Sequence, residues 1–400
     1  MDRAGEYGRR NLSIDMFRAL TMVLMIFVND LWTIKGMPHW LLHSQTTEDF
    51  MGLSDYVFPA FLFAMGMSIP YAIENRFRKG LSAESTLWHI LKRGFALVVM
   101  GVFTVNAGSG LNLGPQSRNL FLILMTLGFF LVWNDYPKGS RSGGILRIAG
   151  VLLLGWMAFR YRTPDGGIFA PKWWGILGLI GWAYLFCATV YLLFRDNLKI
   201  LIPVWLGFVL LCILSTGTRG GAPVVNFPEP NVFDKLRDVL RLDNGAHHAL
   251  AMGGTILSVV SVRHARSWSR KTRIGVAFAA AGVLIGLGFV AHIFFIASKN
   301  LATLPWVLWV MAPCILIYTG LRFLEEKGWT GWFRLIKPAG TATLTTYMIP
   351  NFLIGFCSMT GWNLWGRFSG WAGVLYCIAY VAIVLALAAL LGRLRIRLKI

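Results

Sequence analysis

The sequence has little charge for its length. Only 14% of its 400 residues are charged and 56% are apolar, whereas soluble globular proteins average about 25% charged residues. A soluble chain of this composition would lack the polar side chains needed to cover its surface. The composition therefore excludes a cytosolic enzyme and a disordered protein. It predicts an all-α fold, a polytopic helical membrane protein embedded in the lipid bilayer.

Cysteine is also scarce, and its spacing excludes a disulfide-stapled scaffold. The five cysteines have no CxxC spacing and fall within apolar segments, so we expect small core residues. They are Cys187, Cys212, Cys314, Cys357 and Cys377. The pair His247 and His248 has no third and fourth ligand at helical spacing, so we expect no metal site. A cleavable signal peptide is not expected either, because the first apolar run carries Asp15 and Arg18.

Apolar segments of the length that crosses a bilayer recur along the whole chain. We count about twelve, or eleven if the NAGSGLNLGPQSRN stretch is a break inside one helix. They lie near residues 15–32, 55–74, 94–111, 119–134, 143–160, 174–194, 198–216, 247–262, 274–297, 304–323, 339–358 and 370–391.

The net charge of +20 is mainly a topology signal. If the N-terminus is cytoplasmic, most of the 38 lysines and arginines fall in loops on the cytoplasmic side, as the positive-inside rule requires. We therefore expect one transmembrane domain over residues 1–400, with a short cytoplasmic N-terminus at 1–14 and a cytoplasmic tail at 392–400. This distribution also argues against nucleic acid as a partner.

Ionisable residues inside a membrane helix need a partner or a task, because each costs a few kcal/mol to insert. Asp15 and Arg18 lie three residues apart on one face of the first segment. An intrahelical ion pair at the cytoplasmic interface is the favoured interpretation, and a role in lining a cavity is the alternative.

The densest group of polar residues is predicted at the outer end of the first two segments. Asn29 and Asp30 end the first segment, a loop with His39 and His43 follows, and Asp55 begins the second segment. Histidine is the commonest general base near neutral pH, so these residues are the best catalytic candidates in the chain, against the plain alternative of a solvated loop. Further polar residues lie at the ends of later segments, including His248 and Lys299.

These residues form a pattern similar to that of a known family. The opening SIDMFRALTMVLMIFVN, a short loop with histidine, and GLSDYVFPAFLFAMGMSI resemble the transmembrane acetyltransferases related to heparan-alpha-glucosaminide N-acetyltransferase, and particularly a bacterial branch associated with amino sugars. Later stretches agree with this: WWGILGLIGWAYL at 173–185, HHALAM at 247–252, SKNLATLPW at 298–306 and PAGTATLTTYM at 338–348.

The resemblance implies an N-acetyltransferase with acetyl-CoA as co-substrate. The acetyl group would pass from cytosolic acetyl-CoA across a bacterial inner membrane to the amine of a glucosamine-type sugar in the periplasm. The resemblance also implies a homodimer.

The resemblance further implies roles for individual residues. The catalytic histidine belongs in the loop before the second segment, where His43 is favoured over His39, and the asparagine at the end of the first segment is Asn29. Asp55 matches the aspartate of the family's G-L-T-x-A-D motif. The loop departs from the family's H-A-x-W-N-G-L pattern by inserted residues and by the lack of its tryptophan.

Binding residues are assigned less specifically. The phosphates of acetyl-CoA need cations. The candidates at the cytoplasmic helix ends are Arg18 with its neighbour Asp15, Arg93 and Lys337, although each of these cations also serves as a plain topology charge. For the sugar, the candidates are Asp30, His248 and Lys299. The alternative function is an inner-membrane amino-sugar transporter, which would also use broken helices and polar residues within the membrane.

Overall fold

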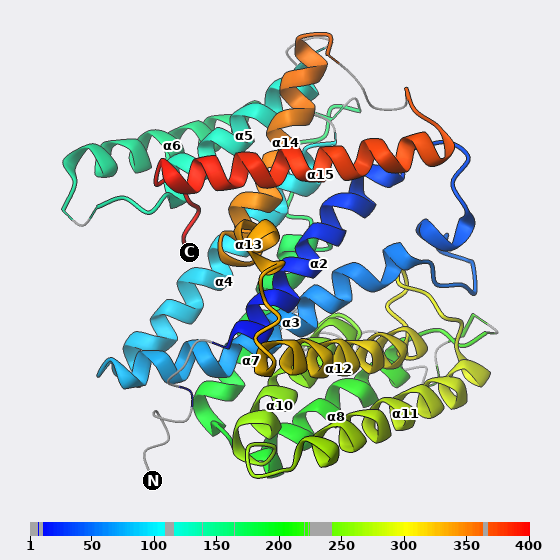
Figure 1. The fold of residues 1–400 in the computed structure, drawn as a ribbon. Helices are drawn as coiled ribbons and strands as arrows, with labels where there is room; N and C mark the ends of the chain where they lie inside the picture. Colours follow the sequence, from blue (N-terminus) through cyan, green and yellow to red (C-terminus); the bar gives the residue numbers. More distant parts are fainter. Residues whose placement is uncertain are drawn as a thin grey trace. The chain divides into compact units, whose positions relative to one another are not determined.

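The structure is a computed structural model that describes residues 7, 11–108, 116–137, 139–163, 165–219, 221–222, 224, 242–362 and 367–400. Within these ranges the chain forms thirteen α-helices, one short 3₁₀-helix and no β-strand (Figure 1). Two isolated bridges, Lys35 with Ser369 and Asn134 with Leu398, are the extended pairings among these residues. The predicted all-α fold class is confirmed.

Every predicted apolar segment overlaps at least one helix. The helices are α2 (Leu12–Leu31), α3 (Leu53–Arg78), α4 (Ala83–Asn106), α5 (Ser117–Trp133), α6 (Arg141–Arg160), α7 (Ile176–Phe194), α8 (Leu198–Ser215), α10 (Ala246–Arg263), α11 (Arg270–Phe294), α12 (Leu304–Glu326), α13 (Phe333–Thr341), α14 (Thr343–Met359) and α15 (Gly370–Arg393), with the 3₁₀-helix η1 at His39–Leu41.

Two boundaries differ in detail from the sequence pattern. The NAGSGLNLGPQSRN stretch separates two helices, because α4 ends at Asn106 and α5 begins at Ser117. The segment predicted at 339–358 is divided into α13 and α14 at Ala342, whose φ of −126° and ψ of 47° are not helical. The Thr346 hydroxyl donates a hydrogen bond to the Ala342 carbonyl at 3.0 Å, which satisfies a backbone group at this break.

Nine helices in the described part of the chain are long and apolar enough to cross a membrane: α2, α3, α4, α6, α7, α8, α11, α12 and α15. The protein is therefore a multi-pass membrane protein. Helix α5 is a shorter apolar helix of 17 residues, and α14 also has 17. Helix α10 has 18 residues but is rich in Gly, Ser and His. Whether these three also cross the membrane stays a prediction.

The chain divides into two compact units. The first contains residues 1–21, 38–94 and 180–333, and the second contains 22–37, 95–179 and 334–400. Helices α2, α4 and α7 each contribute residues to both units. The single domain over residues 1–400 stays a prediction, and the two units are described separately below.

The core of the first unit is built on α3, which packs along α10. Glycines allow this close approach: a Cβ added to Gly66 would lie 1.8 Å from the Ala251 carbonyl oxygen, and one added to Gly254 would lie 2.0 Å from that of Phe63. The Ser258 hydroxyl then reaches the Met67 carbonyl at 2.7 Å. Small residues and interhelical hydrogen bonds are the usual means by which membrane helices associate.

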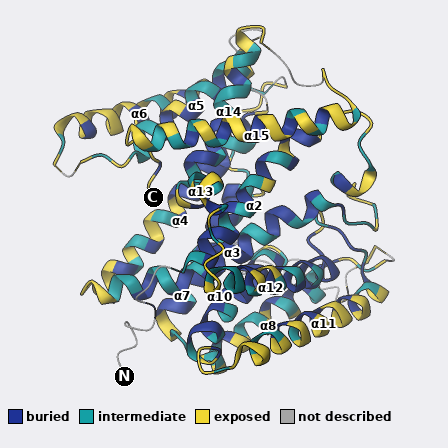
Figure 2. Cartoon of the chain, in the orientation of Figure 1, coloured by how far each residue is buried: buried dark blue, intermediate teal, exposed yellow. Residues whose placement is uncertain are grey.

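Burial distinguishes inner from peripheral helices within this unit. In the most apolar window of α3, 67% of residues are buried, against 28% for α11 and 17% for α8. Figure 2 shows the outward side of α11 as a row of exposed residues. Because exposed apolar side chains such as Phe278, Val283 and Phe289 would be costly in water, this side faces lipid.

In the second unit, α5 packs against α6 and α14, and α14 packs against α15. Gly355 of α14 lies against the backbone of α5, where an added Cβ would be 2.7 Å from the Asn119 carbonyl oxygen. Across both units, the five cysteines are free thiols within helices, and four are buried. Their expected role as small core residues is confirmed for these four, whereas Cys357 is half-buried.

Candidate functional site

The first turn of α3 carries the central carboxylate of the site. Oδ2 of Asp55 accepts hydrogen bonds from the backbone N–H groups of Gly52, at 3.1 Å, and Ser44, at 3.0 Å. A carboxylate in the first turn stabilises a helix by satisfying free N–H groups and by its favourable interaction with the helix dipole. Asp55 is thereby fixed at the N-terminus of α3 and only 1% exposed.

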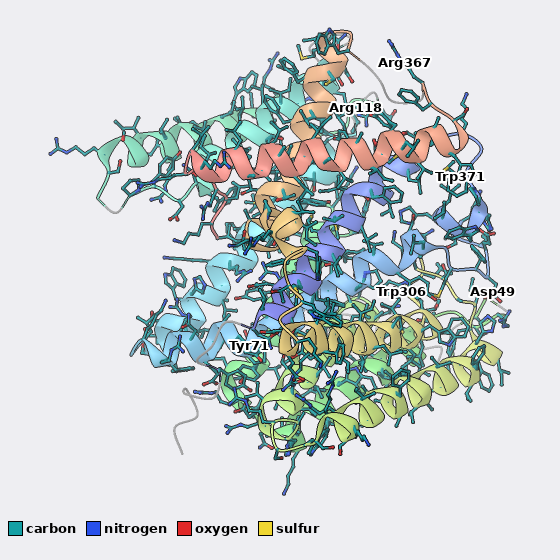
Figure 3. The ribbon with its side chains drawn as sticks, in the orientation of Figure 1. Asp49, Tyr71, Arg118, Trp306, Arg367 and Trp371 are labelled. Atoms are coloured by element: carbon teal, nitrogen blue, oxygen red, sulfur yellow. The ribbon has the colours of Figure 1, made fainter. Side chains whose placement is uncertain are left out.

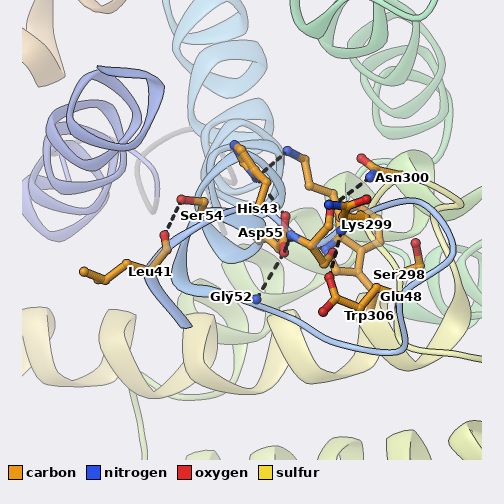
Figure 4. Close-up of polar contacts among 12 residues, drawn as sticks. Leu41, His43, Glu48, Gly52, Ser54, Asp55, Ser298, Lys299, Asn300 and Trp306 are labelled. Carbon is orange, nitrogen blue, oxygen red and sulfur yellow. Dashed lines mark hydrogen bonds and ion pairs between the residues drawn. The ribbon is translucent and has the colours of Figure 1, made fainter. Parts of the chain in front are cut away.

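The second carboxylate oxygen of Asp55 contacts His43. Nδ1 of His43 lies 2.8 Å from Oδ1 of Asp55 (Figure 4). Because an ionised carboxylate only accepts hydrogen bonds, Nδ1 must carry the proton, and the neutral imidazole then keeps its lone pair on Nε2. The His43 side chain is 34% exposed. The contact thus fixes the tautomer of a histidine that is accessible, as a general base must be.

Lys299 brings a positive charge to the same pair. It comes from the loop between α11 and α12, and its Nζ lies 3.2 Å from Nδ1 of His43. Because an Nδ1 that donates to Asp55 has no free lone pair, Lys299 acts there as a neighbouring charge and not as a hydrogen-bond donor to His43. Burial lowers the pKa of Lys299 below its usual value, and the carboxylate of Asp55 opposes this shift. His43, Asp55 and Lys299 are therefore brought together although 256 residues separate His43 from Lys299.

Three further hydrogen bonds hold the backbone of this site in place. The side-chain amide of Asn300 donates to the Ser44 carbonyl at 3.1 Å, and the Ser54 hydroxyl donates to the Leu41 carbonyl at 2.6 Å. The indole N–H of the fully buried Trp306 donates to the Asp55 carbonyl at 3.0 Å. The start of α12 and the loop before it thus position both His43 and Asp55.

A second ionic cluster anchors the same loop through Asp49, labelled in Figure 3. Its Oδ1 lies 2.8 Å from Nε2 of His292 and accepts the Ala297 N–H at 2.7 Å, and its Oδ2 lies 2.7 Å from Nη2 of Arg219. Partial burial acts to raise the pKa of Asp49, but the hydrogen bonds from Ala297, His292 and Arg219 outweigh it and lower the pKa. The ionised form of Asp49 is the one that holds the loop.

His39 has a different environment from His43. Its Nε2 lies 2.9 Å from Glu48, its ring stacks on Phe50 with centroids 4.3 Å apart, and its side chain is 54% exposed. These contacts are with residues of the same exposed loop.

His248 lies inside the first unit and not at its surface. Its side chain is buried, and its ring lies 5.2 Å from that of Phe208 and 5.9 Å from that of Phe186. Its neighbour His247 points to the site residues instead, with its ring 5.9 Å from Trp306 and 5.8 Å from Phe58. A sugar contact by His248 stays a prediction.

Asn29 and Asp30 belong to the second unit. The Asn29 side chain is exposed, whereas Asp30 is 4% exposed. Asn29 as an oxyanion donor and Asp30 as a sugar ligand both stay predictions.

The candidates for binding acetyl-CoA are spread over several helices. Arg18 forms the predicted intrahelical pair with Asp15, at 3.6 Å. Arg93 lies over the ring of Tyr184, 5.0 Å from its centroid, and Lys337 is an exposed residue of α13 in the second unit. The predicted intrahelical pair of Asp15 and Arg18 is present. Its place at the cytoplasmic interface and donor binding by these residues stay predictions.

Sequence reasoning did not select the residues that support the pair of His43 and Asp55. Asn300 and Trp306 both lie in the SKNLATLPW stretch that resembles the acetyltransferase family. That stretch was therefore a signal for their position near the site. Arg219 offered no such signal, because its partner Asp49 is distant in sequence. No group of three or more potential metal ligands occurs among the residues that the structure describes.

Residues 10–229 match a family described as "Domain of unknown function (DUF5009)". The chain belongs to the DUF5009 family. The matched residues include His43, Asp55 and Arg219, and end before Lys299.

The DUF5009 chain is also similar to two curated proteins. It is 36% identical to the heparan-alpha-glucosaminide N-acetyltransferase of Mus musculus over 104 residues and 33% identical to that of Homo sapiens over 105 residues. Each match covers 26% of this chain and 15% of the relative. The matches support a relation to a transmembrane acetyltransferase family, and the bacterial branch stays a prediction.

Proposed function

We propose that this protein is a transmembrane N-acetyltransferase of a bacterial inner membrane. It transfers the acetyl group of cytosolic acetyl-CoA to the amine of a glucosamine-type sugar on the periplasmic side, and both termini are cytoplasmic. The contact of His43 with Asp55 next to Lys299 carries this proposal, because it places an oriented, accessible imidazole beside a cation from a second loop. The names of the two curated relatives agree with this chemistry.

The chemistry assigns a task to each group. The amine nitrogen of the sugar attacks the thioester carbonyl carbon, an N–C bond forms, and the C–S bond breaks. Nε2 of His43 takes the proton that the amine loses, and this proton is passed to the departing thiolate, so that the products are an N-acetyl sugar and CoA thiol. Asp55 acts through His43 and is a positioning residue. In the alternative mechanism, His43 first accepts the acetyl group from CoA and then passes it to the sugar amine.

The roles of the remaining candidates follow from the charges of the substrates and of the reaction intermediate. The attack places negative charge on the former carbonyl oxygen, and a nearby ammonium or amide N–H stabilises it. Lys299 is proposed for this role or for binding the sugar, and Asn29 is proposed as an amide donor. Arg18, Arg93 and Lys337 are proposed to bind the phosphates of acetyl-CoA.

The experiment is an acetyl-transfer assay with pure protein in detergent. It measures CoA thiol release and N-acetylglucosamine formation from acetyl-CoA and glucosamine. The variants are His43→Ala and His39→Ala, a matched pair because both histidines lie in one loop and only His43 contacts Asp55. We expect His43→Ala to lose about 10²-fold or more of the rate and His39→Ala to stay close to wild type.

Two results would overturn the proposal in different ways. Loss of activity in His39→Ala alone would transfer the role of the base to His39. No thiol release from folded wild-type protein, together with glucosamine flux into proteoliposomes, would replace the enzyme by a transporter.

A further inference from the structure

A long apolar groove lies in the first unit, away from His43. It has a volume of about 470 Å³ and runs between α8, α10, α11 and α12. Its walls include Leu257 and Val260 of α10 and Ala280 and Val283 of α11. Helices α8, α11 and α12 turn exposed apolar side chains outward, so the groove opens toward lipid.

The length of the groove matches one leaflet of a bilayer. Along α11 its walls run from Arg270 to Leu284, and along α12 they run from Glu326 back to Met311. At 1.5 Å per residue these stretches are about 21 and 22 Å long. Half of a bilayer is about 15 Å of hydrocarbon plus its polar layer of several ångströms. A groove of this length spans one leaflet when its arginine end lies at the headgroups and its other end near the middle of the membrane.

Arginines gather only at the headgroup end of this groove. Arg270, Arg273 and Arg322 line it there, and Arg322 also lines an adjoining polar cavity of about 240 Å³ with Arg266. The two cavities share Ser261, Arg322 and Glu326. The polar cavity further contains Glu325, Asn11 and Tyr71, the last of which is labelled in Figure 3.

The arginine end of the groove keeps a net positive charge after the contacts of its arginines are counted. Arg273 forms two hydrogen bonds with Glu326, at 2.6 and 3.0 Å, and Arg322 lies 3.5 Å from the same carboxylate. Arg270 lies over the ring of Phe323, 3.8 Å from its centroid. A guanidinium that stacks on a ring uses only its flat face for this contact. Its N–H groups lie in the plane and can still donate hydrogen bonds to a phosphate. Among the described residues that line this end of the groove, three arginines stand against one glutamate, an excess of two positive charges.

We propose that this groove binds an anionic glycerophospholipid. Its phosphate lies at Arg270 and Arg322, and one acyl chain lies along α10 and α11. The walls favour a hydrocarbon chain over the pantetheine arm of acetyl-CoA, because the amides of that arm need hydrogen-bond partners that Ile, Leu, Val and Ala do not supply. The excess charge favours an anionic over a zwitterionic headgroup.

The test is native mass spectrometry of the full chain in a neutral detergent. Phosphatidylglycerol and phosphatidylcholine with identical acyl chains are titrated separately, and inorganic phosphate and acetyl-CoA are then added as competitors. Arg270→Gln with Arg322→Gln removes the two cations. Its matched control is Lys271→Gln with Lys327→Gln, exposed residues at the same helix ends that do not line the groove. Ala280→Trp fills the groove, and its control is the exposed neighbour Ala279→Trp.

Wild type is expected to bind phosphatidylglycerol about tenfold more tightly than phosphatidylcholine. The double arginine variant should lose this preference, and Ala280→Trp should lose most binding of both lipids, while each control stays within about twofold of wild type. Equal binding of the two lipids by wild type would overturn the proposal, as would equal losses in variants and controls. Displacement by inorganic phosphate or acetyl-CoA would assign the site to a soluble anion and also overturn it. Size-exclusion profiles establish that each variant is folded.

Discussion

Oδ1 of Asp55 lies 2.8 Å from Nδ1 of His43, while Oδ2 of the same carboxylate accepts the N–H groups of Ser44 and Gly52. One carboxylate therefore sets the tautomer of the candidate base and also fixes the N-terminus of α3. Its burial makes this arrangement sensitive to substitution, since a buried carboxylate or amide with an unmade hydrogen bond costs about 1–3 kcal/mol.

Asp55→Asn is expected to lower the transfer rate by about 10²-fold or more. The amide has only one acceptor oxygen. If that oxygen keeps the backbone N–H groups, the NH₂ group faces Nδ1 of His43 and imposes the other tautomer, with the proton on Nε2. Nitrogen NMR of labelled histidine should then show the His43 proton moved between its ring nitrogens.

The control for Asp55→Asn is Asp49→Asn, which changes a carboxylate of the same loop that contacts His292 and not His43. A change of the His43 tautomer in both variants, or an unchanged rate in Asp55→Asn, would contradict the positioning role of Asp55.

Lys299→Met is expected to lower the rate by about 10- to 100-fold at neutral pH, because it removes a cation beside His43. The charge of Lys299 is present below its pKa, which burial places below the usual value. The wild-type rate should therefore fall as pH rises through this lowered pKa. Lys299→Arg keeps its charge and should move this fall to higher pH. An alkaline limb that is identical in wild type and Lys299→Arg would exclude Lys299 as its origin.

The sequence predicted the helices better than the contacts that make the site. Apolar runs of membrane-crossing length locate α2 to α15 because the bilayer imposes that length directly. His43 and Asp55 were also predicted together, since only 11 residues lie between them and the start of a helix orders that stretch. Lys299 was predicted as a sugar ligand at an outer helix end and not as a neighbour of His43, because that contact depends on the packing of α12 against α3. The pair of Asp49 and Arg219 likewise required the tertiary structure.

Acid should loosen the loop that Asp49 anchors. Its pKa is lowered in the folded protein, so its contribution to stability is complete above the ordinary aspartate pKa of about 4 and is lost as pH falls through the lowered value. Hydrogen exchange of the Ala297 N–H, corrected for intrinsic rates, should accelerate over that acid range. In Asp49→Asn the Ala297 N–H should already exchange fast at neutral pH, and the acceleration in acid should be absent. An acid step of unchanged size in the variant would assign it to another carboxylate.

Gly52→Ala tests whether the loop before α3 must approach its own backbone closely. The φ of Gly52 is −81°, which any residue adopts, so the requirement is one of space. An added Cβ would lie 1.9 Å from the Leu42 carbonyl oxygen, and this backbone has to move to admit it. Leu42 precedes His43, so the shift displaces the imidazole from Asp55. We expect a loss of activity of 10-fold or more, with reduced thermal stability.

Gly331→Ala provides the matched comparison, because no atom lies within 4 Å of its added Cβ. This substitution should leave both activity and thermal stability close to wild type. Unchanged activity and stability in Gly52→Ala would mean that the loop adjusts without moving His43. The close packing of Gly52 on Leu42 would then have no part in positioning the base. Loss of activity at unchanged stability would instead show that the approach is needed only for orientation of the imidazole.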